Sequence, residues 1–173
     1  SAYGPLQIMF PMVGSLEDIR KAKEYLNLAK EQLKERKQQF DEQIRIGIMI
    51  EIPAIALIAD LAAEEVDFAS IGSNDLTQYL SAADRMNPEV AAYYKSDSTA
   101  MLRLLGFVFR EFSKREKEIS VCGEMAGNPE TAQLLVGLGA RKLSMSSGNI
   151  AGVKAKLAEC TLQELTALAE KKL

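Results

Sequence analysis

The 173-residue sequence carries 21 basic and 24 acidic residues, a formal charge of −3, and 47% of its residues are hydrophobic. That hydrophobic content suffices for one core, whereas the small negative charge argues against a protein that binds nucleic acid or a membrane surface. No apolar stretch approaches the ~20 residues of a membrane-spanning helix, and no signal peptide opens the sequence. We therefore expect a cytoplasmic protein without membrane insertion.

The sequence contains no histidine, which removes the commonest general base and the commonest transition-metal ligand. Its two cysteines, Cys122 and Cys160, form neither a disulfide framework nor a metal-ligand pair. Any active site must therefore use carboxylates, amides, arginine or a thiol.

Short apolar segments of β character alternate with helical segments along the sequence. The expected strands are Leu6–Met12, Ile44–Glu51, Val66–Gly72, Glu118–Gly123 and Lys142–Ser146. Strand followed by helix, repeated five times, predicts a parallel sheet in an α/β fold. Because the strands are continuous apolar runs, we expect both faces of the sheet to be covered.

Signals for helix starts lie between these strands. Ser15 precedes acidic residues and predicts a capped helix that runs to about Gln39. Pro53 suits the first turn of a second helix, with Ile55, Ile58 and Leu61–Ala62 facing inward. Later helices are expected to begin near Asp97–Ser98, Asn128 and Thr161.

Polar residues gather where the expected strands end. They are Glu51 after the second strand, Asn74 and Asp75 after the third, Cys122, Gly123 and Glu124 at the fourth, and Ser144 and Ser146 in the fifth. The carboxyl ends of parallel strands meet at one rim, where ligands bind in α/β folds. The pattern therefore predicts a site at that rim.

Glu51 and Asp75 form a natural pair for Mg²⁺, which takes one or two carboxylates along with substrate oxygens and waters. Each also has a structural interpretation, since a glutamate before proline can cap a helix and Asn-Asp is common in turns. Arg85 could bind a phosphate in bidentate fashion. Alternatively, it could form a surface ion pair with Asp84 or Glu89.

Two interpretations also stay open for Cys122. Most free cysteines are small buried hydrophobic residues. A thiol with an unperturbed pKa near ~8.5 is also mostly protonated at neutral pH and could donate a proton. For Cys160 we expect only a structural role, on a helix without polar neighbours.

Several sequence blocks resemble consecutive blocks of the phosphoenolpyruvate (PEP)-binding domain of Enzyme I of the bacterial sugar phosphotransferase system. The blocks are IMFPMV, GIMIEIPAIALIAD, DFASIGSNDLTQYLSAADR, VCGEMAGNPETAQLLVGLG and LSMSS. Pyruvate phosphate dikinase and PEP synthase share the Asn-Asp and Cys-Gly-Glu elements. The stretch from Ala126 through Ser147 is more similar to Enzyme I.

The resemblance implies a role for each candidate residue. Glu51 and Asp75 match the family's magnesium ligands, and Asn74 matches the amide that contacts the phosphoryl group. Arg85 matches an arginine that binds PEP, and Cys122 matches the cysteine that protonates enolpyruvate.

The resemblance also implies an architecture. Residues 1–173 would form a single partial domain, strands four to eight of a TIM-type (β/α)8 barrel of the phosphoenolpyruvate/pyruvate superfamily. The parent would be a homodimeric enzyme that transfers phosphate from PEP to a histidine of a separate N-terminal domain. A phosphocarrier protein for sugar uptake would then receive it, with release of pyruvate. Met86, where the family usually has glycine, is a departure in a loop.

Two other functions remain open from the sequence alone. One is an enzyme of the pyruvate phosphate dikinase or PEP synthase branch. The other is a non-catalytic half-barrel that serves only for association. Because the phospho-acceptor histidine is not in this sequence, we expect these residues alone to be catalytically inert.

Overall fold

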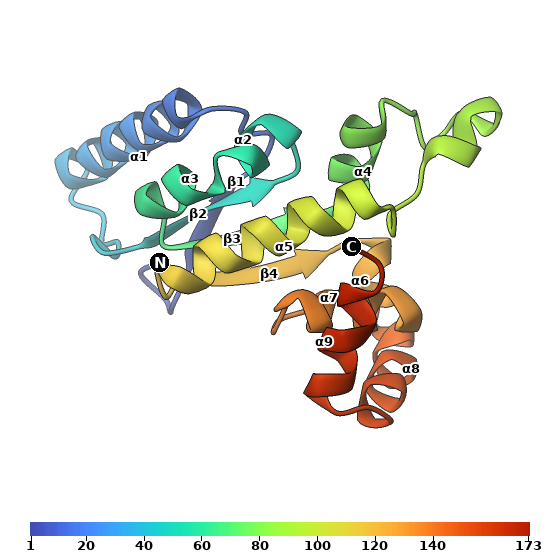
Figure 1. The fold of residues 1–173 in the computed structure, drawn as a ribbon. Helices are drawn as coiled ribbons and strands as arrows, with labels where there is room; N and C mark the ends of the chain where they lie inside the picture. The colour runs from blue at the N-terminus through green and yellow to red at the C-terminus, as the bar shows by residue number, and fades with distance from the viewer.

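The computed structural model describes residues 1–173 and contains one parallel sheet whose strands follow chain order (Figure 1). The strands are β1 (Gln7–Phe10), β2 (Arg45–Ile50), β3 (Phe68–Gly72) and β4 (Glu118–Cys122). Each strand pairs in parallel with the next one along the chain. The predicted α/β fold with a parallel sheet is therefore confirmed.

Helices connect the strands and continue after the sheet. They are α1 (Leu16–Glu35), α2 (Pro53–Leu57), α3 (Ala59–Glu65), α4 (Ser73–Ser81), the 3₁₀ helix η1 (Pro88–Tyr93), α5 (Thr99–Lys114), α6 (Glu124–Gly127), α7 (Pro129–Leu138), α8 (Ser147–Ala158) and α9 (Leu162–Glu170). Helices α7, α8 and α9 pack together beside the end of β4 (Figure 1). None of the helices has the length and apolar character required to cross a membrane.

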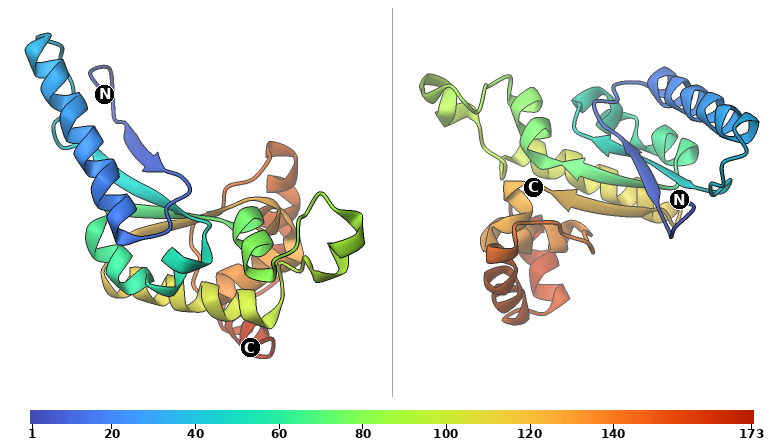
Figure 2. Two further views of the ribbon diagram at one scale, coloured as in Figure 1. Left: turned by 90° about the horizontal axis from the view of Figure 1, so that it is seen from above. Right: turned by 180° about the vertical axis from the view of Figure 1, so that it is seen from behind.

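The hydrophobic core lies between one face of the sheet and helices α3 and α5. Ile48, Ile50, Ile71 and Val121 are fully buried there, together with Phe112 of α5. Met49, which lies between Ile48 and Ile50 in β2, points to the opposite face of the sheet and is only partly buried. Seen from behind, β3 and β4 lie in front of α5 (Figure 2, right). The expectation that both faces are covered is thus wrong, because strands in chain order place their crossover helices on one face.

The expected fifth strand, Lys142–Ser146, is reduced to a single parallel bridge between Leu143 and Val121. Two backbone hydrogen bonds join the segments, from Val121 N to the Lys142 carbonyl at 2.9 Å and from Ser144 N to the Val121 carbonyl at 2.8 Å. Pairing goes no further because β4 ends at Cys122 and Gly123 leads the chain into α6.

The helix starts predicted from capping residues are confirmed, although some helix ends differ. Ser15, Ser98, Asn128 and Thr161 all accept hydrogen bonds from backbone N–H groups of the helices that follow them. Helix α1 ends at Glu35 instead of Gln39, because Lys37 adopts a left-handed conformation with φ 55°.

The predicted second helix is divided at Ile58. This residue ends α2 and precedes α3, with φ −115° and ψ 32°, so helical periodicity does not continue through it. Ile55 and Ala62 are buried as predicted, and Ile58 packs partly against the core. Leu61 is 44% exposed, contrary to the prediction, because the break rotates α3 relative to α2.

Candidate active site

The carboxyl ends of β2, β3 and β4 meet at one rim of the sheet. Ile50 of β2 pairs with Ile71 of β3, so Glu51, the residue after Ile50, lies beside Gly72, the residue after Ile71. On the other side of β3, Gly72 pairs with Cys122 of β4. The chain after β3 enters α4 with Asn74 in its first turn. Parallel pairing therefore brings residues from three separate sequence blocks to the same rim.

Glu51 is a buried carboxylate held from two sides. Its side chain is 4% exposed, and its Oε1 accepts a hydrogen bond from the Met12 backbone N–H at 2.7 Å. Met12 adopts a positive φ of 55°, which directs this N–H at the carboxylate. A Cβ atom at Gly72 would lie 2.7 Å from Glu51 Oε2, so glycine leaves the space that this oxygen occupies.

Glu51 does not cap the helix that follows it, which was its alternative interpretation. The N-cap position of α2 is Ile52, and no side chain bonds to the first backbone N–H groups of that helix. The carboxylate is instead oriented toward the rim and makes no ion pair with a basic side chain.

Asn74 and Asp75 lie in the first turn of α4, whereas the sequence suggested a turn. The Asn74 side-chain oxygen accepts a hydrogen bond from Glu124 N at 3.0 Å. Beside it, the Ser73 hydroxyl donates to the Cys122 carbonyl at 2.6 Å. These two bonds connect the start of α4 to the end of β4.

Arg85 pairs with Asp75, and the alternative ion pairs with Asp84 and Glu89 are not formed. Arg85 Nη1 lies 3.7 Å from Asp75 Oδ1, and both side chains are about a third exposed. The Arg85 backbone N–H also donates to Gln78 Oε1 at 3.1 Å. The structure therefore brings two of the predicted site residues into contact across ten positions of the chain.

Tyr94 is a site residue that the sequence analysis missed. Its hydroxyl donates to the Asn74 backbone carbonyl at 3.2 Å. Burial raises the pKa of the Tyr94 phenol, the negative charge of Glu124 adds to this, and Arg85 opposes it. No periodic or motif signal marks this tyrosine, because its partner lies twenty residues earlier in the chain.

Cys122 is half-buried at the end of β4, and its thiol donates to the Ile71 carbonyl at 3.4 Å. Together with Asn74, Glu124, Ser144 and Asn149 it lines a cavity of about 360 Å³. Cys122 is thus accessible from a polar cavity instead of enclosed in the apolar core.

The other cysteine differs from the expectation in its local structure. Cys160 lies between α8 and α9, not on a helix, and its sulfur accepts a hydrogen bond from Gln133 Nε2 at 3.3 Å. Its hydrogen-bond partner, Gln133, belongs to α7 and is not one of the rim residues.

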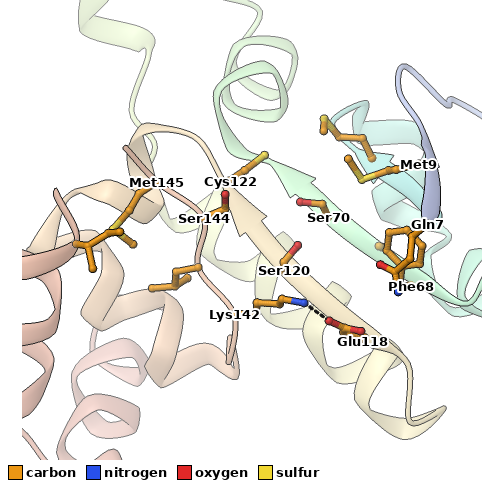
Figure 3. A pocket seen from close by; sticks show the side chains of 14 residues that line it. Gln7, Met9, Phe68, Ser70, Glu118, Ser120, Cys122, Lys142, Ser144 and Met145 are labelled. Carbon is orange, nitrogen blue, oxygen red and sulfur yellow. Dashed lines mark hydrogen bonds and ion pairs between the residues drawn. The ribbon is translucent and has the colours of Figure 1, made fainter. Parts of the chain in front are cut away.

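The face of the sheet opposite the core, the bare face, borders a second cavity of about 680 Å³ (Figure 3). Phe68, Ser70, Ser120 and Cys122 line it from β3 and β4. At the amino ends of the strands, Glu118 pairs with Lys142 and, at 3.3 Å, with Arg45. The hydrogen bond from Lys142 is the main cause of a lowered pKa at Glu118.

The donor set of the rim suits a hard divalent cation. No cluster of three or more histidine, cysteine, aspartate or glutamate side chains is present, so a cage made by the protein alone is not available. Mg²⁺ commonly takes one or two carboxylates and leaves its other positions to substrate and water. Glu51 is buried and has no cationic partner, and Asp75 lies in the first turn of α4, three residues after the end of β3, where only the loose contact with Arg85 engages it. Two carboxylates of this kind fit that requirement.

Comparison with known proteins adds independent information. Residues 1–162 match the family described as PEP-utilising enzyme, PEP-binding domain. Multiphosphoryl transfer protein 2 of Escherichia coli (strain K12) is 46% identical over 164 residues, 95% of this chain and 20% of that protein.

Two further relatives are named phosphoenolpyruvate-protein phosphotransferase. The one from Priestia megaterium is 42% identical over 165 residues, which are 95% of this chain and 29% of that protein. The one from Bacillus subtilis (strain 168) is 42% identical over 171 residues, which are 99% of this chain and 30% of that protein. The chain thus spans less than a third of the length of these relatives.

Gly123 offers a test of the rim geometry. It adopts φ +99°, and a Cβ atom there would lie 2.5 Å from Ser73 Oγ and 2.9 Å from Asn74 Oδ1. We expect Gly123→Ala to lower the free energy of unfolding by about 1–3 kcal/mol, measured by denaturant titration. Gly148→Ala is the control, because a Cβ atom there meets nothing within 4 Å. Equal stability of the two variants would contradict this geometry.

Proposed function

Because this chain belongs to the family of PEP-binding domains of PEP-utilising enzymes, we propose that it is the PEP-binding part of a phosphoenolpyruvate-protein phosphotransferase. The convergence of Glu51, Asp75, Arg85 and Cys122 at one rim carries this proposal. The parent enzyme transfers the phosphoryl group of PEP to a histidine of another domain and then to a carrier protein. This chain supplies no histidine, so the acceptor lies outside residues 1–173.

The proposed architecture is βα units four to eight of a TIM-type barrel, with residues 1–173 as one partial domain. Strands in chain order with helices on one face are what a segment of such a barrel requires. In a closed barrel the inward side chains of all strands fill the interior. The cavity along Met49, Phe68 and Ser120 is then the space that the inward side chains of further strands would occupy.

In this proposal Glu51 and Asp75 would hold Mg²⁺, which would neutralise negative charge at the phosphoryl group. The chain's own groups orient the phosphate. Because Asn74 Oδ1 already accepts a hydrogen bond from Glu124 N, the Nδ2 amide is left to donate to a phosphoryl oxygen. Arg85 adds a guanidinium whose contact with Asp75, at 3.7 Å, is loose enough to be exchanged for phosphate.

Cys122 then acts as the acid of the reaction. When the phosphoryl group leaves, the electron pair of the resulting enolate forms a carbon–hydrogen bond with the thiol proton and yields pyruvate. The thiolate left behind regains its proton from water that reaches the polar cavity. The weak bond from the thiol to the Ile71 carbonyl, at 3.4 Å, costs little to break.

The carboxylate role is tested by Asp75→Ala in the full-length parent. We expect the rate of phosphorylation by PEP to fall about 100-fold or more, because one of the two carboxylates that would hold Mg²⁺ beside the transferred group is lost. Incorporation of labelled phosphate into the protein measures this. Asp97→Ala is the control, since that exposed carboxylate only pairs with Lys172 at 3.6 Å. Near-normal phosphorylation of Asp75→Ala would refute the assignment.

The acid role is tested by Cys122→Ala, with Cys160→Ala as the matched control. We expect Cys122→Ala to slow pyruvate formation by about 100-fold while binding of PEP changes little. Exchange of pyruvate methyl protons with solvent, followed by NMR, should be lost in the same variant. Exchange that persists at the wild-type rate in folded Cys122→Ala would restore a purely structural role.

The bare face and the two sheet edges also predict the behaviour of the isolated chain. Exposed edges and uncovered sheet surface drive association, and the family resemblance implies a homodimer. We therefore expect residues 1–173 to form dimers at low micromolar concentration, measured by light scattering, and to release no pyruvate from PEP. A monodisperse monomer would contradict the first expectation, and turnover of PEP without another protein the second.

A further inference from the structure

The segment between α4 and α5, residues 82–98, projects from the body of the molecule and carries Arg85 and Tyr94 (Figure 1). Its 3₁₀ helix η1 contains no buried residue. Met86 is 82% exposed and Tyr93 is 70% exposed. Since the projecting part has so little apolar packing, its position depends on polar contacts near its two ends.

Two of these contacts end on the first turn of α4. Elsewhere, the Arg85 backbone N–H donates to Gln78 Oε1 at 3.1 Å, and Asp97 pairs with Lys172 at 3.6 Å. Near the start of the segment, Arg85 pairs with Asp75 at 3.7 Å. Near its end, the Tyr94 hydroxyl donates to the Asn74 carbonyl at 3.2 Å. Consecutive residues of α4 thus hold the segment from two sides, at the place where the phosphate of PEP would bind.

The two contacts differ in what happens to them when ligand binds. Under the proposed function, Asp75 would hold Mg²⁺ and Arg85 would bind the phosphate, so the contact between Asp75 and Arg85 would be given up. That contact is also weak in itself, because it is long and both side chains are partly exposed to solvent. The hydroxyl of Tyr94 bonds to a backbone carbonyl, which has no other role in the proposal.

We propose that Tyr94 is a positioning residue that holds segment 82–98 against α4 while Arg85 exchanges Asp75 for the phosphate of PEP. Tyr94 acts through Asn74 and Arg85 and does not itself touch the substrate. This inference rests on the proposed function. Burial raises the pKa of the Tyr94 phenol, so the hydroxyl stays protonated and remains a donor across the neutral range.

Tyr94→Phe removes the hydroxyl and preserves the ring. In the full-length parent we expect the KM for PEP to rise about fivefold, the net value of one hydrogen bond, while kcat stays within about twofold. This split arises because the segment is held equally in the ground and transition states. The matched control is Tyr93→Phe, which removes the same hydroxyl from the neighbouring, exposed tyrosine. A KM unchanged in Tyr94→Phe, or raised equally in both variants, overturns the proposal.

Hydrogen exchange of the same proteins separates this inference from the proposed function. Without ligand, the amides of residues 84–96 should exchange about fivefold faster in Tyr94→Phe and at the wild-type rate in Tyr93→Phe. Failure of the wild-type parent to accept phosphate from PEP would refute the proposed function, and the exchange rates would still decide whether Tyr94 holds the segment. Unchanged exchange in Tyr94→Phe overturns the inference.

Discussion

Parallel pairing of β2, β3 and β4 determines where every candidate group of this protein lies. The register places Gly72 between Glu51 on one neighbouring strand and Cys122 on the other. Because Gly72 has no side chain, the Glu51 carboxylate extends over the middle strand, where a Cβ atom would approach Oε2 to 2.7 Å. A carboxylate and a thiol that lie 71 positions apart in the chain thereby face the same rim. Shifting any strand by one residue would direct these side chains to the opposite face.

A second glycine connects this rim to the helix that carries the amide and the other carboxylate. Gly123, with φ +99°, allows Ser73 and Asn74 to approach the end of β4 closely. The hydrogen bond from Glu124 N occupies the side-chain oxygen of Asn74, Oδ1, and leaves the side-chain nitrogen, Nδ2, free. The orientation of Asn74 is therefore a consequence of the path of the backbone at Gly123. The orientation of a candidate binding group thus depends on a position that has no side chain of its own.

The sequence predicted those features that depend on nearby residues. Capping by Ser15 or Thr161 involves a backbone group three residues away, so it can be recognised locally. The strand ends that supply Glu51 and Cys122 were likewise visible as apolar runs that stop at polar residues. The resemblance then assigned roles that these local patterns left open.

What could not be predicted depends on contacts between distant parts of the chain. The break at Ile58 arises where that side chain packs against the core, and no proline or glycine marks it. The segment around Leu143 was expected to pair along its length, but its neighbour β4 ends too early. Tyr94 reaches Asn74 only because the segment between them folds back, which a propensity argument does not include.

The two ends of the strands differ in their electrostatic environment. At the amino ends, Glu118 lies between Lys142 and Arg45, and its lowered pKa means that this charge stabilises the fold at neutral pH. The stabilisation is lost as the pH falls through the lowered pKa, because protonation removes the ion pairs. At the carboxyl ends, Glu51 is buried without such a partner. The charge of Glu118 is thus neutralised by ion pairs within the protein, whereas the carboxylate of Glu51 makes none.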